Sequence, residues 1–443
     1  MRSVDSEKDI QVSCRVEHLD GRVVFDWDGS TSRVQASCIK LLTTSAALMA
    51  LPADFRWQTR ALLDGKNLHV IGGGDPSIRS LPDRDVKIEF LDGLAASLKS
   101  SGISRLESIV LDDRYFDRNF HHPLWPDDQW QAEYSAPVGG LVMEGGCLEL
   151  HSQSGKVKVV PAVGSKIQVR RSKASDLKQF SAYWRKADDE LNVTGGSKKK
   201  RVLRFAVRNP VKIFGHWLLQ GLKDRGISCV EVHIVEGNSP PLLGKEIWTH
   251  TSAWTLSEAI VVTNKESDNF VAECILKTLG AEKLQDGTAT GGVKAVQEIL
   301  SQNDLDVSGV LQVDGSGFAR SAEKSVNKAS PAMLCALLRK IAEQPEGKLL
   351  FDSLPIAEQS RRTSKFFGDP IFKPQRVHAK TGWITGASSL SGYLQTMGNQ
   401  TLVFSIVVNY IKDNTQRTNN YRFRRLQAQI ISDILSLGHA STD

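Results

Sequence analysis

Three short motifs in this 443-residue sequence hold residue types that can carry out nucleophilic chemistry. They are, in chain order, Ser37-Cys38-Ile39-Lys40, Ser267-Asp268-Asn269 and Lys380-Thr381-Gly382. A serine hydroxyl is a weak nucleophile at neutral pH, and it needs a base close by that can take its proton. Each motif combines a hydroxyl with a lysine or an amide, so the trio predicts a serine nucleophile with its supporting groups.

Ser37 and Lys40 stand three residues apart near the start of a predicted helix at 36–51, where such residues share one face. Lys40 can act as the base if burial and a neighbouring cation lower the pKa of its ammonium group. Lys380 is the predicted neighbouring cation. Ser37 is therefore the candidate nucleophile, and Lys40 is its candidate base.

The second motif is predicted to assist the departure of the leaving group. Ser267 would pass a proton to the leaving amine, and Asn269 would hold Lys40 and the substrate amide through hydrogen bonds. The backbone N–H groups of Ser37 and Trp383 are expected to stabilise the oxyanion. One such donor lowers the barrier by about 3 kcal/mol.

The third motif is predicted to end a strand at 375–380 and to border a substrate that lies along a sheet edge. Lys380 and Thr381 would bind a carboxylate of the substrate. Gly382 and Trp383 complete the candidate substrate-binding segment.

Taken singly, the first two motifs are weak signals. Ser-x-x-Lys also begins at Ser175, Ser197, Ser321 and Ser325, and Ser-x-Asn also begins at Ser301 and Ser325. Such serines more often cap helices or form turns. Lys-Thr-Gly occurs once. The order of the three motifs, each on a suitable element, favours the catalytic interpretation.

The elements around these motifs predict an α+β fold. Strands at 11–18 and 22–27 would form a hairpin at Asp20-Gly21. Predicted helices occupy 255–263, 268–279, 291–302, 331–344 and 422–437, and predicted strands occupy 375–380, 387–397 and 401–410. Between 56 and 245, short strands such as 67–71 and 157–160 alternate with turns around a helix at 87–99.

The composition is that of an ordinary globular protein, with 40% hydrophobic and 24% charged residues. The net charge of +6 is compatible with an anionic polymer as partner. The basic run at 198–201 follows Gly195-Gly196-Ser197, so a solvated turn is favoured over a nucleic-acid patch. The six cysteines have neither CxxC nor zinc-finger spacing, and we expect no metal and no organic cofactor.

The N-terminal residues lack the apolar core and cleavage site of a secretory signal. The longest apolar runs, 41–51 and 402–411, are too short and too polar to span a bilayer, so no transmembrane segment is expected. These features fit either a cytoplasmic protein or a mature or shortened form of an exported one.

The motifs and their surroundings resemble the class C low-molecular-mass penicillin-binding proteins, the D-alanyl-D-alanine carboxypeptidase/endopeptidase family. The similar segments are 36–44, 72–76, 134–138, 314–317, 377–382 and 390–393, so the resemblance covers almost the whole chain. Ser37 and Ser267 lie 230 positions apart. This long gap resembles the extra domains that the family inserts between its first and second motifs.

The resemblance implies a penicillin-binding or β-lactamase-like transpeptidase domain, an antiparallel sheet flanked by helices. This catalytic domain would be built from residues 1–55 and 246–443. Residues 56–245 would form one or more inserted smaller domains, mostly β with some helix.

The resemblance also implies a serine-type carboxypeptidase or endopeptidase that acts on peptidoglycan stem peptides through an acyl-enzyme on Ser37. β-Lactam antibiotics would acylate the same serine, and the protein would work in the periplasm or elsewhere outside the cytoplasmic membrane. Trp383 stands where the family often has Thr, so a hydroxyl that helps to bind the terminal carboxylate is lost. Two alternatives stay open, an esterase or amidase of the same fold and a non-catalytic cell-wall-binding scaffold.

Overall fold

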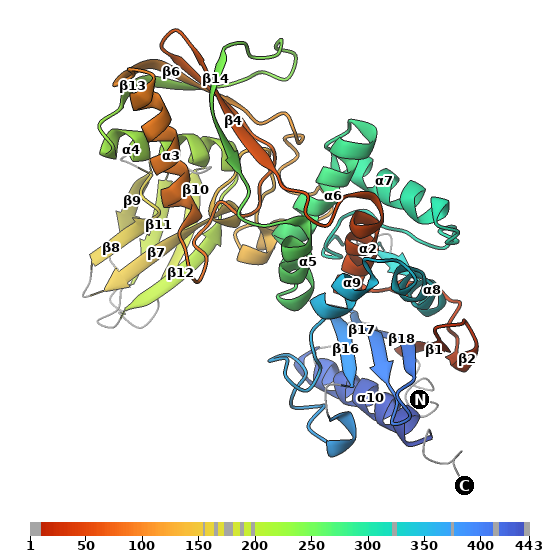
Figure 1. Cartoon of the computed structure of the whole chain (residues 1–443). Coiled ribbons are helices and arrows are strands. Elements are labelled where there is room, and N and C mark those ends of the chain that lie inside the picture. Colours follow the sequence, from red (N-terminus) through yellow and green to blue (C-terminus); the bar gives the residue numbers. More distant parts are fainter. Residues whose placement is uncertain are drawn as a thin grey trace. The chain divides into compact units, whose positions relative to one another are not determined.

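The structure, a computed structural model, describes residues 10–153, 156–163, 167–171, 180–186, 190–195, 200–320, 326–373, 376–410 and 416–437 (Figure 1). The chain forms two compact units. The first comprises the described residues of Met1–Ala53, Leu256–Leu284 and Ala289–Asp443, and the second those of Asp54–Thr255 and Gln285–Thr288. Several residues discussed above lie outside the described residues: Ser175, Gly196, Ser197, Lys198, Lys199, Ser321, Ser325 and Gln375.

The first unit is built on an antiparallel sheet with the strand order β16-β17-β18-β1-β2. Its strands are β1 (Ile10–His18), β2 (Val23–Trp27), β16 (Val377–Ile384), β17 (Ala387–Gln395) and β18 (Thr401–Tyr410). β1 pairs with β18 from Ile10 opposite Tyr410 to His18 opposite Leu402, so the sheet requires both ends of the chain. The predicted β1–β2 hairpin is confirmed, and the predicted strands at 387–397 and 401–410 pair as β17 and β18.

Helices cover both faces of this sheet. They are α2 (Lys40–Ala50), α5 (Leu256–Lys265), α6 (Asn269–Leu284), α7 (Ala289–Gln302), α8 (Pro331–Ala342), α9 (Gly347–Ser353) and α10 (Gln416–Leu437). Alternate residues of a strand point to opposite faces. Leu394 packs in one core with Ile431 of α10, whereas the neighbouring Tyr393 donates a hydrogen bond to the carbonyl of Leu338 in α8, at 2.9 Å.

Helix α2 is the buried centre of the helical layer. Its side chains from Lys40 to Leu48 are all buried, and it packs against α5, α6, α7 and α8. It follows the 3-10 turn η1 (Ala36–Ile39) and ends before Pro52, as proline cannot continue a hydrogen-bonded helix. The predicted buried helix at 36–51 is confirmed, with its first turn tightened to 3-10 geometry.

The second unit is built around a mixed sheet with the order β13-β6-β5-β4-β14. Its main elements are β4 (Gln58–Asp64), β5 (Asn67–Ile71), α3 (Val86–Ser100), β6 (Arg105–Asp112), α4 (Pro210–Asp224), β13 (Ser228–Ile234) and β14 (Lys245–Thr251). β6 runs parallel to β5 and to β13, because α3 and α4 provide the crossover connections.

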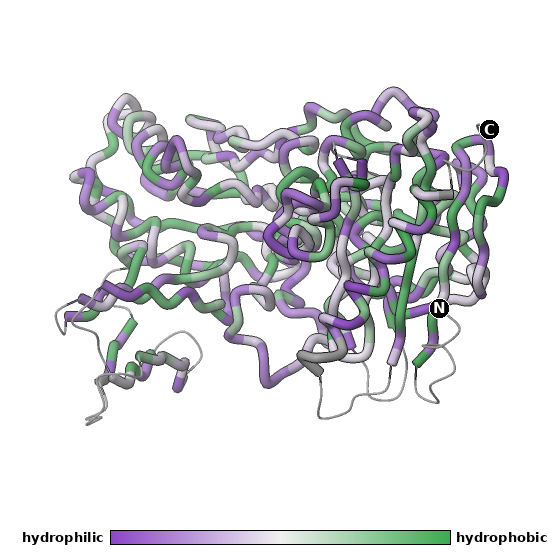
Figure 2. The backbone as a smooth tube through the Cα atoms, turned by 90° about the horizontal axis from the view of Figure 1, so that it is seen from below, coloured by the Kyte–Doolittle hydropathy of each residue, from purple (hydrophilic) through white to green (hydrophobic). Residues whose placement is uncertain are grey.

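Two smaller sheets, β12-β7-β8 and β10-β11-β9, share the core of the second unit. Their strands are β7 (Cys147–Gln153), β8 (Lys156–Val160), β9 (Gln168–Arg171), β10 (Ser181–Lys186), β11 (Glu190–Thr194) and β12 (Arg201–Ala206). Hydrophobic and hydrophilic stretches alternate along the backbone (Figure 2), as expected for elements that bury one side against a core.

The structure differs from the sequence expectations at several points, among them the unpredicted helix α9. Helix α4 was not predicted, although Asn209 caps it by accepting a hydrogen bond from Lys212 N at 2.9 Å and Pro210 occupies its first turn. β14 pairs with β4 and so belongs to the second unit, whereas the sequence placed the boundary at 246. β16 continues to Ile384, beyond its predicted end.

None of the described helices is long and apolar enough to cross a membrane.

Candidate active site

The candidate nucleophile Ser37 lies in the turn η1 that leads into α2. It is partly exposed, whereas its neighbours Ala36 and Cys38 are completely buried. Ala36 has a φ of +47°, a strained conformation for a residue with a side chain and one that concentrates at functional sites. Gly317 packs against this turn so closely that a Cβ there would lie 2.0 Å from the Ala36 carbonyl oxygen. The surroundings therefore hold the turn in the one conformation that exposes the serine.

The Lys40 side chain is fully buried and contacts this serine. Its Nζ donates hydrogen bonds to Ser37 Oγ at 3.2 Å, to Asn269 Oδ1 at 2.7 Å and to the Ser316 carbonyl at 2.7 Å. These three bonds use every donor of an ammonium group. The structure thus brings the candidate nucleophile, the candidate base and the asparagine of the second motif together.

Burial lowers the pKa of Lys40 to about 8, because the ammonium group loses its hydration in the interior. The carboxylates of Asp314 and Glu273 oppose this shift, and the guanidinium of Arg362 adds to it. A large fraction of Lys40 is therefore neutral near pH 8. A neutral amine at this distance from Ser37 Oγ can accept its proton.

Ser267 and Lys380 form a second pair. Lys380 Nζ donates to Ser267 Oγ at 2.8 Å and to the Thr381 carbonyl at 3.0 Å. Burial and then the charge of Lys40 hold the pKa of Lys380 well below its usual range. Ser267 has a φ of +57° and stands two residues before Asn269, the first residue of α6. This turn directs the serine to Lys380 and the asparagine to Lys40.

The Lys380-Thr381-Gly382 motif lies inside β16, so the prediction that the strand ends at Lys380 is wrong. At Gly382 the strand passes the nucleophile. A Cβ there would lie 3.0 Å from Ser37 N and 2.4 Å from the Gln35 carbonyl oxygen, so glycine is required for the close approach.

Two hydrogen bonds fasten β16 and β17 to the nucleophile turn. Cys38 Sγ donates to the Lys380 carbonyl at 3.2 Å, and Ser389 Oγ donates to the Gln35 carbonyl at 2.6 Å. Burial raises the pKa of the Cys38 thiol, which keeps it protonated. Cys38 is therefore a structural residue and not a second nucleophile.

The outer edge of β16 is covered only along its first half in the described part of the chain. Ala357 N donates to the Val377 carbonyl at 2.9 Å, and Ala379 N donates to the Pro355 carbonyl at 2.9 Å. Residues two apart on a strand direct their N–H groups the same way. The Trp383 N–H therefore points to the same outer edge as that of Ala379, at the level of the nucleophile. The Trp383 side chain is 45% exposed.

Sequence analysis missed two buried carboxyl groups beneath the candidate base. Glu273 accepts hydrogen bonds from Gly315 N at 2.9 Å and Ser316 N at 2.8 Å, and Asp314 holds the backbone further along the same loop. Burial, reinforced by Asp314, raises the pKa of Glu273 to about 7. Glu273 stands four residues after Asn269 on α6, and this helical spacing is the signal that could have revealed it.

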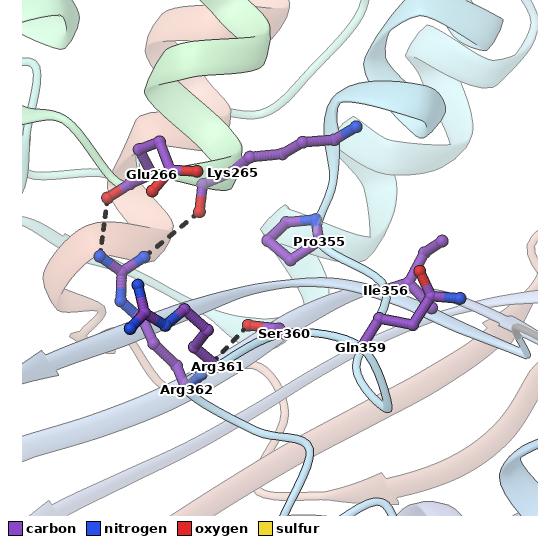
Figure 3. A pocket seen from close by; sticks show the side chains of 8 residues that line it. All are labelled: Lys265, Glu266, Pro355, Ile356, Gln359, Ser360, Arg361 and Arg362. Carbon is purple, nitrogen blue, oxygen red and sulfur yellow. Dashed lines mark hydrogen bonds between the residues drawn. The ribbon is translucent and has the colours of Figure 1, made fainter. Parts of the chain in front are cut away.

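A third missed residue, Arg362, holds the segment before the second motif. Its guanidinium donates to the carbonyls of Lys265 at 3.3 Å and Glu266 at 2.7 Å (Figure 3). Arg424 of α10 donates in turn to the Arg362 carbonyl at 2.7 Å. No local pattern marks this arginine, because it meets the second motif only through the tertiary fold.

The chain belongs to the D-Ala-D-Ala carboxypeptidase 3 (S13) family, which it matches over residues 8–430. It is 28% identical over 432 residues to a D-alanyl-D-alanine carboxypeptidase of Actinomadura sp. (strain R39), covering 89% of this chain and 76% of that one. The crystal structure of penicillin binding protein 4 from Haemophilus influenzae has a similar fold, with a TM-score of 0.79, 23% identity and coverage of 97% and 99%. A penicillin G-acylated predatory endopeptidase from Bdellovibrio bacteriovorus is more distant, with a TM-score of 0.56, 16% identity and coverage of 96% and 93%.

The expected family and the α+β penicillin-binding fold are thereby confirmed. The chain is an enzyme of a serine carboxypeptidase family.

Proposed function

We propose that this enzyme hydrolyses D-Ala-D-Ala bonds, or the equivalent cross-links, of peptidoglycan stem peptides through an acyl-enzyme on Ser37. The observation that carries the proposal is the arrangement of two serine–lysine pairs, Ser37 Oγ 3.2 Å from Lys40 Nζ and Ser267 Oγ 2.8 Å from Lys380 Nζ. Membership of the S13 family and the relative named a D-alanyl-D-alanine carboxypeptidase support the substrate class. The first unit is the catalytic domain in this proposal, and the second is an inserted domain.

Acylation begins when neutral Lys40 takes the proton of Ser37. The serine Oγ then bonds to the carbonyl carbon of the penultimate D-alanine, and the backbone N–H groups of Ser37 and Trp383 stabilise the resulting oxyanion. The proton passes through Ser267 to the leaving amine as the amide C–N bond breaks. Lys380 and Thr381 hold a carboxylate of the leaving residue.

Deacylation restores the enzyme when water attacks the ester on Ser37. A β-lactam follows the same acylation step, but its ring-opened product stays attached to the serine.

Action outside the cytoplasmic membrane belongs to the proposal, because the stem peptides lie there. Accessibility of the protein to added protease in osmotically opened, membrane-intact cells tests the location.

The direct test of the nucleophile is intact-protein mass spectrometry after incubation with benzylpenicillin, followed by peptide mapping. We expect one stable adduct on the peptide that contains Ser37 and none on a Ser37→Ala variant. Ser436→Ala, at an exposed serine on α10, is the matched control and should label like the wild type. A benzylpenicillin adduct that still forms on the Ser37→Ala variant would show that Ser37 is not the nucleophile.

A second candidate function, an esterase or amidase of the same fold, is favoured by one observation. The side chain next to the Lys-Thr-Gly motif is the half-exposed indole of Trp383, which offers no hydroxyl to a terminal carboxylate. Turnover of a simple ester faster than of a D-Ala-D-Ala peptide supports this candidate. A Trp383→Thr change that restores the peptidase preference would identify the indole as the cause.

A further inference from the structure

A pocket of about 400 Å³ opens beside the second motif of the first unit (Figure 3). Its volume is within the range of roughly 300–1,000 Å³ that is usual for ligand sites. Lys265, Glu266 and Arg362 line it near the end of α5, and Pro355, Gln359 and Arg361 line it from the segment that precedes β16. No residue of the three motifs lines it, although Lys265 and Glu266 immediately precede the second motif.

The pocket lies at the Ser267–Lys380 end of the catalytic arrangement. Lys265 and Glu266 immediately precede Ser267, whose Oγ contacts Lys380 Nζ. Pro355 pairs with Ala379, the residue before Lys380. Trp383, one of the two predicted oxyanion donors, stands further along β16, beyond the pairing of Pro355.

This end of the site is where the leaving group must be. Under the proposed function, Ser267 delivers the proton to the leaving amine, so that amine lies next to Ser267 Oγ. The chain attached to the amine then continues away from the nucleophile and past Lys380. The pocket lined by Lys265 and Pro355 is next on that path.

The charges in the pocket favour an anionic occupant. Lys265, Arg361 and Arg362 supply three cations, and Glu266 supplies one carboxylate. Arg362 is occupied by the carbonyls of the α5 end, but Lys265 and Arg361 are exposed and neither forms an ion pair with another described residue. In Figure 3 the Arg361 guanidinium lies beside that of Arg362, and the Lys265 side chain extends over Pro355. A guanidinium and an ammonium with no carboxylate partner form a site for a carboxylate.

We infer that this pocket receives a leaving peptide that is larger than D-alanine and carries a carboxylate of its own, as the second stem peptide of a cross-link does. This inference rests on the proposed function and narrows it towards endopeptidase action. D-Alanine ends in a carboxylate at Lys380 and Thr381, and it is too small to reach and fill the pocket. A cross-linked strand continues beyond its leaving amine, and Lys265 and Arg361 are placed to bind its free carboxylate.

The experiment compares two substrates that share the same acyl donor and differ only in the leaving group. One releases D-alanine, and the other is a cross-linked peptide dimer that releases a second stem with free carboxylates. We expect the Lys265→Gln, Arg361→Gln double variant to lose roughly tenfold in kcat/KM for the dimer, as two exposed charges together contribute about this much, and to keep the D-alanine substrate within twofold. The loss of kcat/KM for the dimer should become smaller as the salt concentration is raised, because salt screens exposed charges.

Two controls separate the inference from the proposed function. Lys294→Gln, Lys348→Gln removes two exposed cations of the first unit that do not line the pocket and should leave both substrates unchanged. Benzylpenicillin acylation of the double pocket variant at the wild-type rate shows that its site is folded. Equal effects on both substrates, or none, overturn the pocket assignment while the acyl-enzyme function stands. A wild-type protein that penicillin does not acylate refutes the proposed function itself.

Discussion

Buried lysines occur in both units, and the contrast between them shows how one residue type can serve stability or chemistry. Lys87, at the start of α3 in the second unit, forms ion pairs with the carboxylates of Glu144 and Asp85. Lys40 and Lys380 in the first unit donate only to hydroxyl, amide and backbone oxygens. All three are almost completely inaccessible to water.

The difference lies in what compensates for the lost hydration. A buried ammonium beside a carboxylate keeps its charge, whereas one surrounded by neutral oxygens gives up its proton more easily. The second unit therefore holds its lysine in ion pairs with two carboxylates. The first unit keeps two lysines in a state from which a proton can be exchanged with a serine.

The largest expected effect is on the chemistry of the first unit. Lys40→Met keeps most of the side-chain volume but removes the base, so benzylpenicillin acylation of Ser37 should slow by about 10³-fold. The rate is measured by quenched-flow mass spectrometry, with Lys87→Met as the matched variant. Near wild-type acylation of Lys40→Met would place the base elsewhere.

The next effect is on stability, and here we expect the larger change from Lys87 and not from Lys40. Lys87→Met leaves Glu144 and Asp85 without their ammonium partner and should lower the free energy of unfolding of the second unit by about 3 kcal/mol. Acylation of Ser37 should stay within twofold of the wild type. Urea unfolding followed by tryptophan fluorescence reports this, because most of the tryptophans belong to the second unit. A larger loss of stability in Lys40→Met than in Lys87→Met would contradict the comparison.

A smaller effect should appear in the pH profile of acylation. Lys40 accepts a proton only when it is neutral, which is the state above its pKa of about 8. The acylation rate should therefore rise by about tenfold from pH 7 to the plateau at higher pH, with a midpoint near the pKa of this amine. A profile that is flat across this interval would show that Lys40 is already neutral at pH 7 or is not the base.

The smallest effect concerns the carboxyl group beneath the base. The charge of Glu273 raises the pKa of Lys40, so Glu273→Gln should move the midpoint of the acylation profile to lower pH. Glu298→Gln, at an exposed position on α7, is the control and should leave the midpoint in place. A midpoint that moves upward would mean that Glu273 acts on Lys40 mainly through the position of the Ser316 carbonyl.

Local patterns were sufficient to predict the parts of the site that lie within one element. The three-residue spacing of Ser37 and Lys40 needs only a helix, and the strands β17 and β18 needed only an apolar run with a turn. The position of Gly382 against Ser37 was not predictable, because it depends on how β16 packs on η1. The same holds for Arg362, which reaches the carbonyls before Ser267 from a different segment of the chain.

Backbone conformation explains why other parts of the site could not be predicted from the sequence. Ser267 and Ala36 both have positive φ angles, although neither is a glycine. Sequence propensities disfavour such conformations, so they are maintained only by surrounding contacts such as the approach of Gly317 to Ala36. The candidate catalytic residues were therefore easier to select from the sequence than the residues that hold them in place.

The pairing of β1 with β18 sets an order of events during protein synthesis. The ribosome makes Ser37 early, but β16 and β17, the strands that contact the turn of this serine, come from the last quarter of the chain, as does β18. All strands of the second unit have been synthesised once the chain reaches Thr251, so its sheets can fold on the growing chain. At that stage β1 is still unpaired with β18, because β18 has not yet been made. A chain released before residue 401 has the nucleophile and the whole inserted unit, but it cannot close the sheet that carries the third motif.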